Sequence, residues 1–358
     1  MNRCEINSRR EIKPLKRGWK IFTFFLLLIV ASCHPHKSPV ERAFYYWKTT
    51  FTLSEKEKYY LRDLQVKKIY LRFFDVDWSE KFNAPTPLGE INFLTKTDSS
   101  FSIIPVVFIT NKTLERISGP GISSLAEDIF KETAHIASEN AISYAELQLD
   151  CDWTDKTKDN YFTLLSLIEK KLHQENKMIS STIRLHQVKY SDRTGIPPVD
   201  RGMLMFYNMG KINSDLTSNS IYDDEIAAKY SSFIDKYPLP LDVVIPDFSW
   251  TVQIRKSKVV NLLENIDSHQ LRNNRNFTAQ SSTVYKSDTS FFLHGSYIMQ
   301  NDLLKAEEIN PSLCEQAAKR VSKGLKDEKR TVAIFDFDSL TIVKYEKGDV
   351  ENIFRHFN

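Results

Sequence analysis

Three carboxylates spaced along one short apolar segment are the residues best suited to chemistry. The segment 144–154 reads YAELQLDCDWT and contains Glu146, Asp150 and Asp152. Because side chains alternate between the two faces of a strand, these carboxylates share one face with Gln148, and the apolar residues share the other. Carboxylates held close together push their pKa values apart, which is how acid/base sites arise. We therefore expect Asp152 and Asp150 to supply the acid and base of a hydrolytic site.

Other apolar segments carry side chains that could hold a substrate beside this pair. The predicted substrate-binding set is Glu146, Arg72, Arg184, His186, Tyr207, Asn208, Asp247, Trp250 and Asp336. Asp247 or Asp336 would act as a catalytic partner from across the site, while Arg184 and Tyr207 would position the substrate. In the alternative interpretation, Glu146 forms a structural ion pair with one of the arginines, and the tryptophans are ordinary core aromatics.

Eight short segments rich in β-branched and aromatic residues are predicted to be strands. They cover 44–51, 68–74, 103–109, 145–150, 179–186, 203–208, 241–245 and 332–337. Helical patterns follow several of them, at 54–64, 123–138, 158–173, 222–236 and 349–356. Strands that alternate with helices favour parallel pairing. Eight such units predict an α/β fold of the (β/α)8 TIM-barrel type, with a doubly wound open sheet as the alternative.

Three stretches depart from this regular alternation. The segments 78–100 and 188–201 each contain two prolines and show no clear helix. The long connection after the seventh strand predicts a small α+β insertion at about residues 251–310, followed by a helix that starts near Pro311. Its predicted elements are a helix at 258–266 and strands at 277–285 and 290–299. Because active sites of such barrels lie at the C-terminal ends of the strands, the candidate residues should meet at that mouth.

The fourth and sixth strands resemble motifs of the family-18 glycoside hydrolases, the chitinase-like barrels. The sequence DCDW at 150–153 is similar to that family's Asp-x-Asp-Trp-Glu, and MFYN at 205–208 is similar to its Met-x-Tyr-Asp. The resemblance implies a sugar-related barrel that acts on or binds carbohydrate at its mouth. The position of the family's catalytic glutamate is occupied by Thr154, which does not protonate a leaving group as a carboxylic acid does. A non-catalytic barrel that binds a glycan or a protein is therefore the alternative to a glycoside hydrolase.

The two hypotheses predict different barrel mouths. Two carboxyl groups that face one open cleft favour a hydrolase, because such chemistry needs an acid and a base on either side of the bond. A mouth filled by Phe291, Phe292 and Tyr297 of the insertion favours a binding protein.

The N-terminal segment resembles the signal of an exported bacterial lipoprotein. Seven Arg and Lys residues within the first 20 precede an apolar run, IFTFFLLLIVA, at 21–31. A run of this length is typical of a signal-peptide core and is shorter than the roughly 20 residues of a membrane span. It ends in VASC, which resembles a lipobox and implies acylation of Cys33. The expected organisation is a signal peptide at 1–32, a lipidated tether at 33–42 and a barrel domain at 43–358, with a soluble secreted protein or an uncleaved anchor as alternatives.

A lipid on Cys33 predicts attachment to the cell envelope, with the membrane as one partner and carbohydrate as the other. The tether lacks an acidic run, so we expect the outer membrane facing the periplasm, with surface display as the alternative. The 49 Lys and Arg residues nearly balance the 46 Asp and Glu residues, which does not indicate a nucleic-acid-binding protein. With no CxxC, HExxH, P-loop or GxGxxG motif, no metal and no cofactor is expected. Cys151 and Cys314 are expected to be buried thiols, although a single disulfide is possible.

Overall fold

The chain folds into a closed barrel of eight parallel strands. In the computed structural model, which describes residues 40–264, 266–339 and 341–358, the strands follow one another in chain order, and β1 pairs with both β3 and β18. This ring confirms the predicted (β/α)8 TIM-type fold over an open sheet. The barrel strands are β1 Glu41–Tyr46, β3 Lys68–Ser79, β6 Ser102–Ile109, β7 Glu146–Asp150, β8 Met178–Arg184, β9 Arg201–Met205, β10 Leu241–Pro246 and β18 Thr331–Phe335.

All eight predicted strands are present, because parallel strands buried on both faces read as nearly continuous apolar runs. Four of the predicted strands were too long, and of these the sixth ends at Met205 and the eighth at Phe335. The first barrel strand ends at Tyr46, and the next short strand, β2 Thr50–Phe51, pairs with β5 Asn92–Phe93 outside the ring. The fifth ends at Arg184, where a helix begins, so His186 lies on a helix and not on the predicted strand.

A bulge in β3 changes which side chains of this strand face the barrel mouth. The register with β6 slips between Arg72 and Phe74, so that Phe73 has no partner. An extra residue reverses the alternation of side chains beyond it. Asp75 therefore lies on the same side of the strand as Arg72 and pairs with it.

Beyond the bulge, β3 continues into an antiparallel hairpin, where a barrel of this type normally has a crossover helix. The second strand of the hairpin, β4 Ala84–Leu88, pairs with the end of β3 and forms the edge of the barrel sheet. The missing helical pattern in 78–100 is explained by this hairpin. Pro85 and Pro87 are tolerated because an edge strand needs hydrogen bonds on one side only.

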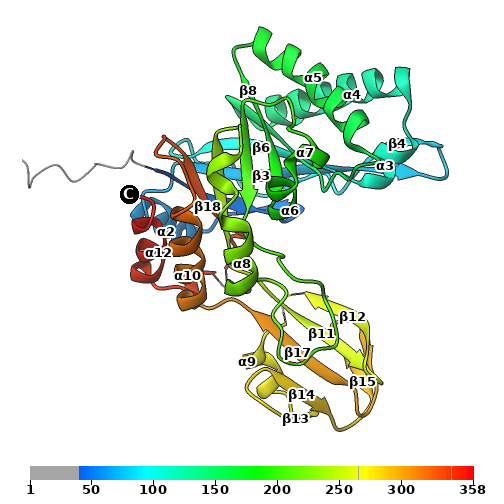
Figure 1. Cartoon of the computed structure of the whole chain (residues 1–358), viewed down its shortest axis with the longest axis vertical. Coiled ribbons are helices and arrows are strands. Elements are labelled where there is room, and N and C mark those ends of the chain that lie inside the picture. The colour runs from blue at the N-terminus through cyan, green and yellow to red at the C-terminus, as the bar shows by residue number, and fades with distance from the viewer. Residues whose placement is uncertain (1–39, 265, 340) are drawn as a thin grey trace, which may run out of the picture. The chain divides into compact units, whose positions relative to one another are not determined.

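The remaining connections place helices on the outside of the barrel. In the helix at 119–139, apolar side chains recur every three or four residues and are buried, as expected of a helix that packs on a sheet. The helices are α2 Glu55–Asp63, α3 Asn111–Arg116, α4 Gly119–Glu139, α5 Lys158–Gln174, α6 Leu185–Lys189, α7 Ser191–Thr194, α8 Asp224–Ser231, α10 Pro311–Ser322, α11 Thr341–Lys344 and α12 Lys347–Arg355, with the 3-10 helix η1 Ile234–Lys236. Figure 1 shows α4 and α5 side by side, and the two helices are in contact.

The predicted α+β insertion follows β10 and has a hydrophobic core of its own, which includes Tyr285, Ile298 and Leu304. Its elements are β11 Ser249–Arg255, β12 Lys258–Glu264, α9 Ser268–Arg272, β13 Phe277–Ala279, β14 Val284–Ser287, β15 Phe291–Leu293, β16 Ser296–Ile298 and β17 Leu303–Glu308, coloured yellow to orange in Figure 1. The helix predicted at 258–266 is wrong. This segment forms β12, which pairs antiparallel with β11, because adjacent β-branched valines favour a strand once a hairpin partner is available.

The predictions for the N-terminus fall outside the part of the chain that the structure describes. They concern the signal peptide at 1–32, the acylated Cys33 and most of the tether at 33–42. The first barrel strand already begins at Glu41. Among the helices within the described residues, none combines the length and the apolar character needed to cross a bilayer. Cys151 and Cys314 are buried free thiols, as expected.

Candidate functional site

The lumen of the barrel contains a layer of polar side chains that starts from β7. Ser180 Oγ donates to Glu146 at 2.6 Å, and Tyr45 Oη donates to Gln148 at 2.5 Å. Tyr70 Oη also approaches Glu146, at 3.5 Å. These partners come from three other barrel strands, so the even-numbered side chains of β7 point inward, as the alternation predicts. Burial raises the pKa of Glu146, and neither arginine considered as its ion-pair partner contacts it.

Asp150 lies at the C-terminal end of β7 and is almost completely buried. Thr182 Oγ1 donates to its carboxylate at 2.6 Å. Burial raises the pKa of Asp150 to about 6, because the charged form loses its hydration, while the nearby Arg184 opposes this effect and Asp152 adds to it. A carboxyl group with this pKa exchanges its proton close to neutral pH, which suits acid/base chemistry.

Asp152 lies two residues beyond Asp150, and its side chain is 52% exposed. Its carboxylate accepts a hydrogen bond from Nε of Arg184, whose own side chain is only 18% exposed. Burial would lower the pKa of Arg184, but the two aspartates outweigh it and raise that pKa. The guanidinium also lies over the ring of Tyr207, 5.8 Å from its centroid. Arg184 is therefore held in place by an ion pair on one side and an aromatic ring on the other.

A hollow of about 260 Å³ at this mouth brings five of the predicted site residues together. Its lining consists of Asp152, Arg184, Leu185, His186, Tyr207, Asn208, Met209 and Tyr230. Burial lowers the pKa of His186, so its imidazole is neutral near pH 7 and can both donate and accept a hydrogen bond. The hollow thus offers a cationic donor, a carboxylate and a neutral imidazole within one small space.

Asp75 is a further charged residue at this mouth that the analysis of the sequence missed. Arg72 holds its carboxylate with two hydrogen bonds, of 2.7 and 2.5 Å. Its negative charge contributes to the raised pKa of Asp150. The available signal was the repeated Asp-x-Asp-Trp pattern, which occurs at 75–78 and again at 150–153. The guanidinium of Arg72, a residue predicted to bind substrate, forms an ion pair with Asp75.

Asp247 and Asp336 line a second pocket, of about 560 Å³, where the barrel rim meets the insertion. Asp247 is buried and lies 3.3 Å from Nζ of Lys344, and burial raises its pKa to about 7. Burial, reinforced by Asp338, raises the pKa of Asp336 to about 6. Neither carboxyl lines the hollow beside Asp152, so the structure does not place them opposite it.

Aromatic rings form the wall between the hollow and the second pocket. Tyr207 lines the hollow, Phe248 lines the pocket, and their rings are 5.4 Å apart. Phe335 packs against both, at 5.5 Å from Tyr207 and 5.7 Å from Phe248. Trp250 lies behind this wall, against Phe248, and donates its indole N–H to Glu307 at 2.9 Å. This bond joins β11 to β17 within the insertion, and the predicted role of Trp250 in substrate binding stays a prediction.

The residues around position 154 have structural roles. Thr154 is exposed, and its backbone N–H donates to Thr157 Oγ1 at 2.8 Å, which shapes the loop after β7. Trp153 is buried against Tyr161, with ring centroids 5.4 Å apart, and it donates to the carbonyl of Thr194 at 3.0 Å. This tryptophan belongs to the core, and no carboxylic acid replaces the family's glutamate at position 154.

The insertion does not fill the barrel mouth with the aromatic residues considered above. Phe291, Phe292 and Tyr297 belong to the hairpin β15–β16, where Phe292 is 71% exposed. None of them lines the hollow. The hollow beside Asp152 thus matches neither of the two mouths that distinguished the hypotheses, whereas Asp247 and Asp336 share the second pocket.

One group of side chains within the described residues could hold a metal ion. Ligand atoms of Glu169, His173 and Asp200 lie within 4.8 Å of one another, and none of the three lines the hollow. His173 Nε2 is 3.1 Å from both carboxylate oxygens of Asp200, which raises the pKa of His173. Asp200 also accepts the backbone N–H of Ile179 at 2.8 Å. These contacts explain the group as an ion pair that supports β8.

Comparison with solved structures finds proteins whose fold is similar to this barrel. The chain is similar to the spore cortex-lytic enzyme SleL of Bacillus cereus, with a TM-score of 0.53 and 10% identity over 90% of this chain and 75% of that one. SleL of Bacillus megaterium QM B1551 has a TM-score of 0.54 and 12% identity, over 90% of this chain and 75% of that one. The C-terminal domain of a putative chitinase from Desulfitobacterium hafniense DCB-2 has a TM-score of 0.52 and 8% identity, over 90% of this chain and 99% of that one.

No family model matches the sequence, and no curated protein matches it in a sequence search. The class of protein that the fold defines is a (β/α)8 barrel with an α+β insertion after its seventh strand. At identities of 8–12%, this likeness concerns the fold.

Proposed function

We propose that this protein binds carbohydrate in the hollow at the barrel mouth. The proposal depends on Arg184, which is largely buried and whose Nη1 has no hydrogen-bond partner among the described residues. Leaving a buried charged donor unpaired is costly, and an acceptor on a ligand would remove that cost. Sugar hydroxyls accept from a guanidinium and donate to a carboxylate, which fits the pairing of Arg184 with Asp152.

The structural neighbours support a sugar as the ligand. Two of them are spore cortex-lytic enzymes and one is a putative chitinase domain. The hollow of this chain occupies the strand ends where barrels of this type place their active sites. His186 and Asn208 at its rim add polar groups that can exchange hydrogen bonds with hydroxyl or amide groups of a glycan.

Binding without cleavage is the form of this function that the geometry favours. Hydrolysis of a glycosidic bond needs a carboxylic acid that reaches the leaving oxygen. Thr154 removes that acid, Asp152 is engaged by Arg184, and Asp150 is buried beneath them in a bond to Thr182. The mouth therefore retains the polar groups that hold a sugar, while its carboxylates are already occupied.

Hydrolysis is the second candidate, and the raised pKa of Asp150 favours it. A carboxyl group with a pKa of about 6 is partly protonated near neutral pH and can act as an acid or a base. In this form of the proposal, the substrate displaces Arg184 from Asp152. Asp150 and Asp152 then serve as the acid and the base of the hydrolysis. The catalytic roles predicted for both aspartates belong to this candidate.

We further propose that the protein is anchored to the bacterial cell envelope by a lipid on Cys33. The basic N-terminus, the apolar core at 21–31 and the VASC sequence support this proposal. Outer-membrane attachment facing the periplasm follows from a tether that lacks an acidic run, and surface display is the alternative. Incorporation of radiolabelled palmitate is expected in the wild type and absent from Cys33→Ala. Equal labelling of the two would refute the anchor.

A glycan-binding experiment tests the main proposal. Full-length protein in detergent is applied to a glycan array and titrated with chitin oligosaccharides and bacterial cell-wall fragments. We expect Arg184→Met to weaken binding by about tenfold or more, the loss typical of a charged hydrogen-bonding partner. Arg193→Met is the matched control, since Arg193 pairs with Asp155 on the surface and does not line the hollow. Equal binding by Arg184→Met and wild type would refute the site.

Hydrolysis is separated from binding by product analysis of the same ligands. If the protein cleaves a bound glycan, Asp150→Asn should abolish the product without abolishing binding. If no product forms from any ligand that binds, the binding function stands and the hydrolytic candidate is refuted. Cleavage that persists unchanged in both Asp150→Asn and Asp152→Asn would place the chemistry elsewhere.

A further inference from the structure

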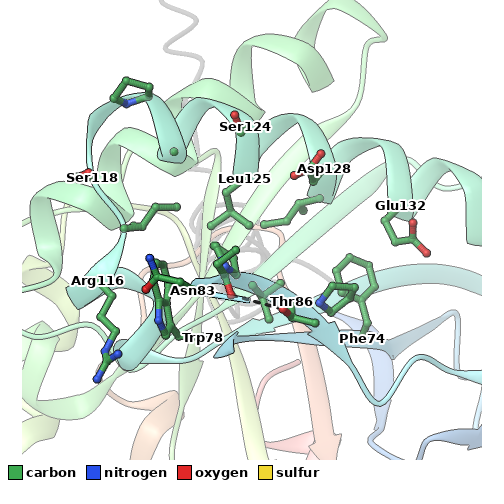
Figure 2. A pocket seen from close by; sticks show the side chains of 18 of the residues that line it. Phe74, Trp78, Asn83, Thr86, Arg116, Ser118, Ser124, Leu125, Asp128 and Glu132 are labelled. Carbon is green, nitrogen blue, oxygen red and sulfur yellow. Dashed lines mark hydrogen bonds between the residues drawn. The ribbon is translucent and has the colours of Figure 1, made fainter. Parts of the chain in front are cut away.

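A groove of about 1100 Å³ lies on the flank of the barrel, between the β3–β4 hairpin and α4. Figure 2 shows α4 above the hairpin, with Leu125 and Asp128 on the helix and Phe74 and Trp78 on the strand. The apolar floor and the polar rim have the mixture of surfaces typical of ligand-binding sites. None of its lining residues belongs to the hollow at the mouth, so the groove is a separate site.

One end of the groove is negatively charged. Asp128 and Glu132 are one turn apart on α4 and line the groove. Across the described ranges 40–264, 266–339 and 341–358, neither carboxylate takes part in a hydrogen bond or an ion pair. The two basic residues of the lining are already engaged, Arg116 with Glu80 at 2.6 Å and Lys131 with the helix neighbour Glu127 at 3.2 Å. The negative end is therefore open to a cation from outside.

The other end of the groove lies at the N-terminus of α4. This helix has 21 residues, and its N-cap Ser118 makes no side-chain capping bond. Ser118, Pro120 and Gly121 line the groove. Pro120 has no N–H, and the N–H of Gly121 donates to the carbonyl of Ser118 at 2.8 Å, so the N–H of Gly119 and the positive end of the helix dipole are what favours an anion here. Along the same helix, the groove thus runs from an anion-favouring end to a cation-favouring end.

The floor of the groove holds an unused hydrogen-bond donor. Trp78 is 9% exposed and lines the groove, and its indole Nε1 has no hydrogen-bond partner within the described part of the chain. A buried N–H group without an acceptor destabilises the fold, so such groups are rare unless a ligand or water satisfies them. This donor lies on the strand side, opposite the carboxylates of α4, and calls for an acceptor such as a peptide carbonyl.

We propose that this groove binds a short peptide with two free ends, its carboxylate at the start of α4 and its amine at Asp128 and Glu132. The helix rises about 1.5 Å per residue, so Gly119 and Asp128 are roughly 14 Å apart along the axis and Gly119 and Glu132 roughly 20 Å. An extended peptide spans about 3.3–3.6 Å per residue. The spacing therefore fits a peptide of about four to six residues, with a carbonyl near Trp78.

The length and charge requirements are tested with alanine peptides. Full-length protein in detergent is titrated calorimetrically with free-ended peptides of about three to eight residues, and the tightest binding is expected at about four to six. Acetylating the amine or amidating the carboxylate of the best peptide should weaken binding by about tenfold each, because each change removes one charged contact. Absence of binding at millimolar peptide, or equal binding by the capped peptides, would overturn the proposal.

Variants of the groove locate the binding on the protein. Asp128→Asn combined with Glu132→Gln should weaken binding by about tenfold or more. The charge-matched control is Glu90→Gln combined with Glu115→Gln, which changes two exposed glutamates outside the groove. Trp78→Phe keeps the ring and removes the donor, and it should weaken binding less. Equal losses in the groove and control variants would overturn the site, while glycan binding at the mouth, measured on the same proteins, reports on the other proposal separately.

Discussion

Replacing Asp150 by asparagine should stabilise this protein, and increasingly so as the pH rises. The carboxyl group is buried at the end of β7, and its carboxylate accepts from Thr182 Oγ1. Asparagine has nearly the same shape, keeps an oxygen that can accept this bond, and carries no charge at any pH. The substitution therefore removes the cost of burying a negative charge and leaves the packing of the barrel mouth in place.

The size of the effect follows from the pKa of Asp150, which burial raises from 3.8 to about 6. The folded state holds the proton more tightly than the unfolded state does. The free energy of unfolding of the wild type therefore falls as the pH rises between these two values and stays reduced above them. Since a difference of one in pKa corresponds to about 1.4 kcal/mol, the full loss is about 3 kcal/mol.

Urea denaturation followed by tryptophan fluorescence measures this difference. The stability of Asp150→Asn relative to wild type should grow by about 3 kcal/mol between about pH 4 and about pH 7. Asp192→Asn, a change at an exposed aspartate, should show no such trend. A difference between Asp150→Asn and wild type that stays constant with pH would refute a buried, proton-binding Asp150.

Two further substitutions test the insertion and the core. The side chains of Lys305 and Glu307 are both 1% exposed and form an ion pair of 2.6 Å. Lys305→Met should lower the free energy of unfolding by about 3–5 kcal/mol, because the buried carboxylate of Glu307 loses its cation. Adding Glu307→Leu should recover part of this loss. Trp153→Ala should cost about 3–5 kcal/mol by opening a cavity beside Tyr161, and glycan binding should persist where the protein stays folded. Urea titrations check both, and a loss below about 1 kcal/mol in either single variant would contradict the packing described.

The barrel could be predicted because its signals are local and repeated. Each barrel strand is a short apolar run, and the intervals between them leave room for crossover connections. The alternation of side chains along 146–150 was sufficient to place Glu146, Gln148 and Asp150 in the lumen. The two arginines considered as partners of Glu146 bind other carboxylates, Arg72 to Asp75 and Arg184 to Asp152.

The features that were not predicted depend on contacts between segments far apart in the sequence, which local patterns do not indicate. The bulge at Phe73 reverses the faces of the strand beyond it, and only its register with β6 shows it. The segment 258–266 has apolar spacing that suits a helix, but a neighbouring strand pairs with it instead. Asp247 and Asp336 lie at adjacent strand ends, as expected. The rings around Phe335 separate their pocket from the hollow beside Asp152.

A closed barrel has no free strand edges, and the β3–β4 hairpin adds one. Pro85 and Pro87 pair with Trp78 and Val76, at positions whose backbone groups point away from β3, because neither proline has an N–H to donate. Along the outer edge of β4, carbonyl oxygens therefore lack neighbouring N–H groups. Another strand has too few hydrogen-bond donors there to pair with. Copies crowded together on a surface would therefore not form edge-to-edge polymers through this hairpin.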